Sequence, residues 1–208
     1  MSKKEKRTLT AAEKRRLERF EETAENLRQQ GYVRHDLTVS IVKANVFSVF
    51  LLIPLAFIGY GGYYLVHHTI EFGGMNPLVF FLLMLVLIVV HELIHGISWS
   101  FFAPHGFKDI EFGIMMQYLT PYCTCLAPLK KSRYVFGSAM PLIILGILPM
   151  IAGIVLRNPA VLLMGIIMAD GAAGDIMVIA RVLGYKSNAE DIVYMDHPTE
   201  AGGVIFER

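Results

Sequence analysis

The sequence has 208 residues, 54% of them hydrophobic, and a mean hydropathy of +0.50, whereas apolar residues make up about 45–50% of an ordinary soluble domain. Of its 19 Lys and Arg residues, 11 lie in residues 1–43 and none in residues 44–107, so a charged head precedes apolar segments. A net charge of +1 without a basic stripe gives no sign of a nucleic-acid partner, and two cysteines are too few for a disulfide framework. The composition therefore excludes an ordinary soluble domain and favours a membrane protein.

Residues 8–30 are predicted to form an amphipathic helix. Thr10 and Glu13 fit a capping box, and Gly31 fits the stop signal that follows a helix. The apolar face consists of Leu17, Phe20, Ala24 and Leu27. This segment, residues 1–31, is expected to be cytoplasmic, where it either lies on the membrane surface, docks a partner or packs on its own domain. The sequence leaves these alternatives open.

Residues 32–208 are expected to form one membrane-embedded domain that begins with a strand. Residues 33–41 show the two-residue apolar alternation that is typical of a strand. Four apolar segments follow, each long enough to cross a hydrocarbon core, which takes about 20 helical residues. They span about residues 44–66, 78–103, 134–156 and 160–183. Pro141 and Pro149 should kink the third segment.

Basic residues in the polar regions predict the orientation. Lys and Arg are concentrated in the N-terminal region, the loop 104–133 and the C-terminal tail. By the positive-inside rule these regions are cytoplasmic, so we expect a cell-membrane protein with both termini in the cytoplasm. The expected fold class is mainly α: a multi-pass membrane helical bundle of about four spans, with the N-terminal amphipathic helix and a small cytoplasmic β-hairpin.

The hairpin is predicted within the loop 104–133. Residues 110–118 alternate in apolar character, and Thr120-Pro121 interrupts them before a second short run. An exposed edge of this hairpin could accept an extended peptide as an added strand. Alternatively, the hairpin caps the bundle or pairs with the strand predicted at residues 33–41.

The second apolar segment contains the pattern H-E-x-x-H, formed by His91, Glu92 and His95. On a helix, residues four apart lie on nearly the same face, so both imidazoles can reach one metal ion, and the Glu lies where it can take a proton from water. Ionisable side chains within a membrane span are unfavourable by about 2.5–3.5 kcal/mol each when charged, and they mark functional sites. The pattern therefore predicts a Zn²⁺ site with Glu92 as the catalytic base.

Catalytic zinc requires a third protein ligand, and depth along the helices selects Asp175. His91 lies about 13 residues into its segment and Asp175 about 15 residues into the fourth, which runs in the same direction. At about 1.5 Å per residue the two side chains lie within roughly 3 Å of the same depth. Asp170 lies shallower and on another face, so it is expected to be an outer contact of the site or a buried polar group. His91, His95 and Asp175 are the predicted metal ligands.

The sequence resembles a family of membrane-embedded zincin peptidases that was once known only as a domain of unknown function, and it is distantly similar to the site-2 proteases. The resemblance covers about residues 32–205 and is carried by the HELIHG segment, His91–Gly96, together with four shorter segments. These are Pro121-Tyr122-Cys123, Pro141, Gly174-Asp175 and Asp196-His197-Pro198. The resemblance implies proteolysis within or beside the bilayer but supplies no substrate.

The predicted function is that of a zinc metallopeptidase that hydrolyses peptide bonds of membrane-associated protein or peptide substrates near the cytoplasmic side. Two rivals stay open: a non-catalytic membrane scaffold or accessory protein with a structural or inactive metal site, and a hydrolase of a non-peptide bond. Cys123 and Cys125 could form a second metal site, but two thiols alone make a poor one, so free cysteines are expected. The expected partners are the substrate and the lipid bilayer, and the sequence does not fix the oligomeric state.

Overall fold

The structure is a computed structural model that describes residues 10–72, 74–115 and 120–208. Helix α1, Ala11–Gln29, has the predicted capping box: the Thr10 hydroxyl accepts from the Glu13 amide at 3.2 Å, and the Glu13 carboxylate accepts from the Thr10 amide at 2.8 Å. Gly31 follows the helix with φ +88°, a conformation that favours glycine. The predicted start and stop of this helix are confirmed.

A three-stranded antiparallel sheet joins the two ends of the described chain. Its strands are β1, Val33–Thr38, β4, Ile192–Asp196, and β5, Gly202–Glu207, in the order β1-β5-β4. The strand predicted at residues 33–41 is confirmed over residues 33–38, while residue 41 already begins a helix. Strands β4 and β5 have no counterpart among the predicted elements.

The two faces of this sheet pack against different parts of the protein. On one face α1 contributes the buried side chains of Phe20, Ala24 and Leu27, so the predicted apolar helix face packs on its own domain. The sheet residues in this cluster are Val193, Met195, Val204 and Phe206. On the other face Tyr194 and Ile205 join a second buried cluster, which includes Trp99 and Tyr134 from the apolar helices.

Within the residues that the structure describes, three helices are long and apolar enough to cross a membrane, and a bent pair would make a fourth. Helix α2 is Ile41–His67 and α3 is Pro77–Ser100. The third consists of α4, Lys131–Pro141, a π-helical turn, Leu142–Ile147, and α5, Leu148–Val155. The bent pair is α6, Pro159–Gly171, and α7, Ala173–Gly184. The predicted number of apolar segments, about four, agrees with this arrangement.

Two of these segments differ from the expected simple spans. In the third, Pro141 is followed directly by the π-helical turn, so the chain accommodates the proline, which lacks an amide donor, by widening the helix. The fourth is not one helix: it bends by 48° at Ala172. This bend has no proline to signal it in the sequence.

The predicted hairpin is present, with β2, Ile110–Met115, paired antiparallel with β3, Thr120–Cys125. It does not pair with β1, whose partner is β5, so that alternative is wrong. A 3₁₀ turn, Gly106–Asp109, links α3 to the hairpin. The hairpin packs on α3 at Gly96, where an added Cβ would lie 2.4 Å from the Phe112 ring.

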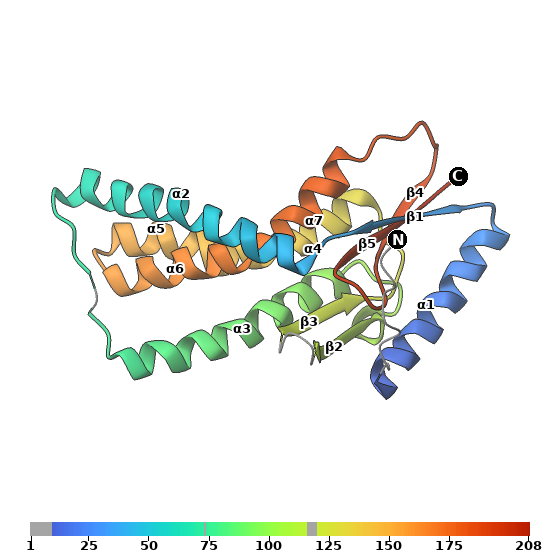
Figure 1. The fold of residues 1–208 in the computed structure, drawn as a ribbon, viewed down its shortest axis with the longest axis horizontal. Coiled ribbons are helices and arrows are strands. Elements are labelled where there is room, and N and C mark those ends of the chain that lie inside the picture. Colours follow the sequence, from blue (N-terminus) through green and yellow to red (C-terminus); the bar gives the residue numbers. More distant parts are fainter. Residues whose placement is uncertain (1–9, 73, 116–119) are drawn as a thin grey trace.

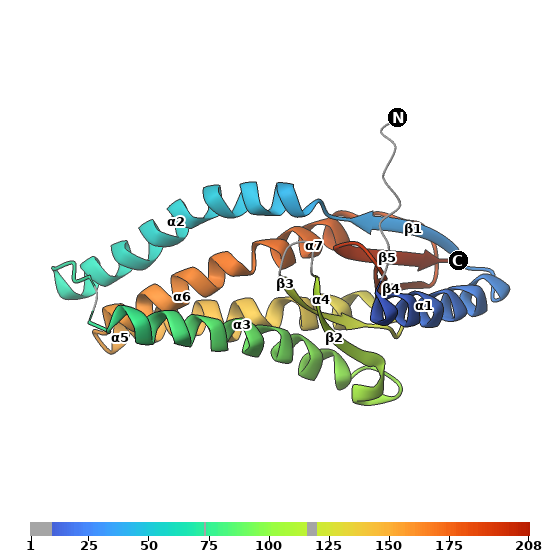
Figure 2. The same cartoon turned by 60° about the horizontal axis from the view of Figure 1, so that its bottom comes forward.

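Figure 1 shows that α1 and the strands gather at one end of the protein, while α2, α5, α6 and most of α3 extend towards the other end. The same separation is visible after a 60° rotation in Figure 2. The C-terminal half of α3, together with α4 and α7, lies at the junction between the strand-rich end and the apolar helices.

Candidate metal centre

The two histidines and the aspartate predicted as ligands lie together. His91 and His95 are buried on one face of α3, and Asp175 lies in the first turn of α7. The Nε2 atom of His91 is 3.1 Å from Asp175 Oδ2, and the Nε2 atom of His95 is 3.3 Å from Asp175 Oδ1. One ligand atom from each of the three residues lies within 4.8 Å of the other two. The fold therefore brings the predicted ligand set to one point.

The bend at Ala172 separates Asp175 from Asp170. Asp170, at the end of α6, accepts a hydrogen bond from the Ser48 hydroxyl of α2 at 2.7 Å. Its other oxygen is buried and has no partner among the described residues. Asp170 is therefore a polar contact between α6 and α2, and it does not join the cluster around Asp175, although it borders the same cavity.

The ring of His95 is oriented by groups outside the predicted site. Its Nδ1 atom lies 2.9 Å from the Gly137 carbonyl oxygen, which can only accept a hydrogen bond. Nδ1 therefore carries a proton; with a metal ion bound, Nε2, on the side of Asp175, would present its lone pair to the ion. A metal-binding histidine usually has such a partner on its second ring nitrogen.

Trp99 covers the His95 ring. The two rings stack at 5.0 Å between centroids and 13° between planes, and the indole N–H donates to the Tyr134 carbonyl at 3.1 Å. A Cβ at Gly137 would lie 2.1 Å from the indole ring, so only glycine fits there. The sequence analysis missed these residues. Trp99 was detectable because it lies four residues after His95, on the same helix face.

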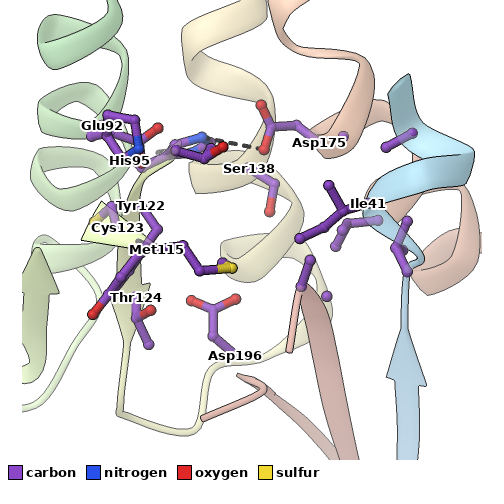
Figure 3. Close-up of a pocket in the computed structure, with 18 of the residues that line it drawn as sticks. Ile41, Glu92, His95, Met115, Tyr122, Cys123, Thr124, Ser138, Asp175 and Asp196 are labelled. Carbon is purple, nitrogen blue, oxygen red and sulfur yellow. Dashed lines mark ion pairs between the residues drawn. The ribbon is translucent and has the colours of Figure 1, made fainter. Parts of the chain in front are cut away.

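Glu92 borders a cavity of about 490 Å³ together with the three predicted ligands. Figure 3 shows the Glu92 side chain beside His95, with Asp175 across from it and strand β3 next to them. Cys123, in β3, borders the same cavity as Glu92. The predicted base and the predicted ligands thus share one cavity.

The donor set fits zinc. Two imidazole nitrogens and one carboxylate oxygen are the protein ligands of many catalytic zinc sites, which leave one position open. Since the Gly137 carbonyl holds a proton on His95 Nδ1, the ion would replace the proton on Nε2, and the cavity beside the cluster leaves room for substrate. His91, His95 and Asp175 are therefore the residues that would hold the ion.

The two cysteines do not resemble a second metal site. Both are free, and Cys125 is fully buried. Burial raises the pKa of the Cys125 thiol to about 12 and that of Cys123 still further above its ordinary value. Burial therefore keeps both thiols protonated in the folded protein.

Asp196, at the end of β4, borders the cavity opposite the metal cluster (Figure 3). Its carboxylate accepts hydrogen bonds from the Tyr134 hydroxyl at 2.6 Å and from the Cys125 amide at 2.8 Å. Burial raises its pKa to about 6. Asp196 is not among the site residues predicted from the sequence, because nothing local indicates that the C-terminal strand returns to the helices.

Comparison with known proteins identifies the family. A family model described as "Putative zincin peptidase" matches residues 84–189, half of the chain, a range that contains His91, Glu92, His95 and Asp175. No curated protein and no solved structure matches. The chain belongs to this family of zincin peptidases.

Proposed function

We propose that this protein is a zinc-dependent metallopeptidase, embedded in the membrane, that hydrolyses peptide bonds of membrane-associated substrates near the cytoplasmic side. The observation that carries the proposal is the convergence of His91, His95 and Asp175 beside Glu92 on one cavity. The family adds independent support, because its members are described as zincin peptidases.

The residues of the site have separate roles in the proposed reaction. Zinc held by His91, His95 and Asp175 would supply a Lewis acid that polarises the peptide carbonyl and activates water. Glu92 is the group that accepts the proton of the attacking water and returns it to the leaving amine.

Strand β3 provides a place for the substrate backbone. Five successive residues of this strand, 120–124, border the cavity. The Cys125 amide donates to the Asp196 carboxylate rather than to β2. Cys123, two residues earlier in the same antiparallel ladder, has the same orientation, so this edge of the strand faces the site. We infer that an extended peptide lies beside β3, as strand-adding ligands do, with its scissile bond next to Glu92.

The exposed surface of the helices supports the membrane location. Side chains such as Ile53 and Phe57 on α2 and Leu78 and Val86 on α3 are more than half exposed. Apolar patches of this extent are rare on soluble monomers but suit a hydrocarbon core. The predicted metal ligands His91 and His95 lie in the C-terminal half of α3, near the strand-rich end. If that end is cytoplasmic, as the basic residues predict, hydrolysis takes place near the cytoplasmic side.

The proposal is tested with wild type and Glu92→Gln purified in detergent. We expect about one zinc ion per chain in both proteins and cleavage of membrane-derived peptides by the wild type. The variant should be slower by roughly 10²–10⁴-fold, the usual contribution of a general base. Glu25→Gln, which changes an exposed charge on α1, is the matched control and should cleave normally.

The outcomes separate the rivals. Zinc in both proteins without cleavage by the wild type would favour a scaffold or accessory protein with an inactive site. Cleavage of an ester or other non-peptide bond alone would favour a different hydrolase. Absence of zinc from both would contradict the metal centre itself.

A further inference from the structure

Asp196 differs from the other acidic groups of the strand-rich end. Several of these form ion pairs with basic side chains: Asp36, Glu111, Asp191 and Glu207. Across the described part of the chain, no Lys, Arg or His forms an ion pair with Asp196. Its two partners, the Tyr134 hydroxyl and the Cys125 amide, are both neutral. Asp196 is thus a carboxylate on the cavity wall without a cationic partner.

Arg16 is the cationic side chain that borders the same cavity, and it is engaged elsewhere. Its guanidinium donates to the Pro198 carbonyl and lies 4.4 Å above the centre of the Tyr122 ring. It therefore influences Asp196 only at longer range.

The carboxylate of Asp196 can accept more hydrogen bonds. Oδ1 accepts one from Tyr134 and Oδ2 accepts one from Cys125, while each carboxylate oxygen has two lone-pair sites. With a pKa of about 6, the group is ionised in most molecules at pH 7. A half-buried anion of this kind is stabilised when a cation approaches it.

Among the described residues, the carboxylates of Glu92, Asp170, Asp175 and Asp196 line the cavity. One guanidinium, that of Arg16, lines it with them, and a zinc ion would offset two of the negative charges. A cavity of one dominant sign attracts the opposite charge.

We propose that Asp196 binds a positively charged group of the substrate, a lysine or arginine side chain close to the scissile bond. This inference rests on the proposed peptidase function and specifies its substrate class. Cytoplasmic segments that flank membrane spans are rich in Lys and Arg. The favoured substrates are therefore membrane proteins cleaved at such a basic flanking segment.

Binding is measured first, in zinc-loaded Glu92→Gln protein in detergent, so that no substrate is consumed. The probes are N-acetylated fluorescent peptides that carry one Lys or, in its place, the uncharged isostere norleucine. We expect the Lys peptide to bind about tenfold or more tightly, in line with charge pairs removed from water. Adding Asp196→Asn should reduce this preference to less than about twofold. A peptide without Lys but with a free α-amino group tests whether a chain terminus supplies the cation instead.

Tyr134→Phe is the matched control for a structural effect. It removes one hydrogen bond to Asp196 but keeps the charge, so the preference for Lys should persist. Equal binding of both peptides, in a protein that retains zinc, would overturn the proposal, as would a preference that survives Asp196→Asn. The comparison of peptides on the protein with Asp196 intact decides the question even if Asp196→Asn does not fold.

Cleavage by the protein with Glu92 intact then separates this inference from the proposed function. Cleavage of both peptides at equal rates would refute the role of Asp196 and leave the peptidase standing. Binding that depends on Asp196, without any cleavage, would support the cation site and contradict the peptidase.

Discussion

His95, a proposed metal ligand, is oriented by residues that would not themselves bind the metal. The Gly137 carbonyl fixes its ring proton, and Trp99 stacks on its ring. Because Gly137 has no side chain, the Trp99 indole can occupy the space beside it. The orientation of this ligand is therefore set by packing between α3 and α4.

Gly137→Ala should disturb this packing. The added Cβ would lie 2.1 Å from Trp99. The shifts that such overpacking forces typically destabilise a protein by about 1–3 kcal/mol. We expect a lower melting temperature and weaker retention of zinc during dialysis. Gly184→Ala is the control, because nothing lies within 4 Å of its Cβ position. Equal zinc retention by the two variants would show that Trp99 does not orient His95.

Asp175 and Asp170 should differ in their effect on the metal. Asp175 faces both histidines, whereas Asp170 contacts Ser48. We predict that Asp175→Ala loses most of its zinc in dialysis followed by metal analysis, while Asp170→Ala retains it. The reverse pattern would transfer the ligand role to Asp170.

Asp196 should make stability depend on pH. Burial raises its pKa from 3.8 to about 6, so the folded protein binds this proton more tightly than the unfolded chain does. The resulting stabilisation is fully present below about pH 4 and is lost as the pH rises through about 6. Asparagine cannot titrate. The melting temperature of wild type minus that of Asp196→Asn should therefore fall between pH 4 and pH 7, and a constant difference would contradict the burial of this charge.

At the scale of elements, local sequence signals were sufficient for α1, β1 and the hairpin. The capping box and Gly31 mark the ends of a helix, and two-residue alternation marks a strand. The H-E-x-x-H spacing places both histidines on one helix face, and depth matching then selected Asp175. These features depend on residues close together in the sequence or on simple helical rise.

The remaining elements depend on distant contacts. Strand β5 pairs with β1 across most of the chain, Val33 opposite Glu207, and no local pattern encodes such a partner. The bend at Ala172 occurs among small residues without proline, so hydropathy predicted one continuous segment. Gly137 acts through its backbone carbonyl, which any residue possesses, and therefore gives no signal of its own.

The close packing of α5 on α6 rests on glycine. A Cβ at Gly165 would lie 2.5 Å from the backbone nitrogen of Met150, and a backbone atom cannot move aside as a side chain can. Small residues allow such approach between membrane helices. Gly165→Ala should lower the melting temperature in detergent by several degrees, whereas Gly61→Ala, with open space around it, should not. Similar melting temperatures of the two variants would mean that α5 and α6 can move apart without loss of thermal stability.

At the scale of the whole molecule, polar and apolar parts occupy different ends (Figure 1). The link between α2 and α3 and the turn between α5 and α6 meet at the apolar end, where Arg157 pairs with Glu71 at 2.8 Å. Both connections should face the outside if α1 and the sheet face the cytoplasm. The division at residue 31 and the distant similarity to site-2 proteases stay predictions.

Cysteine labelling in vesicles tests this orientation. Phe72, in the α2–α3 link, is 77% exposed, and Glu22 is exposed on α1. A membrane-impermeant maleimide should label Phe72→Cys only in right-side-out vesicles and Glu22→Cys only in inverted ones. The unsubstituted protein, with its partly buried Cys123 and buried Cys125, gives the background. Labelling of both variants from one side would contradict the proposed crossing of the membrane.

The metal centre is tested most directly by anomalous scattering at the zinc absorption edge from crystals of the zinc-loaded protein. We predict one strong peak between His91 Nε2, His95 Nε2 and the Asp175 carboxylate, at about 2.0–2.2 Å from each ligand atom. Zinc located at other residues, or no peak at this cluster in a protein that is otherwise folded as described, would contradict the metal centre and with it the proposed peptidase.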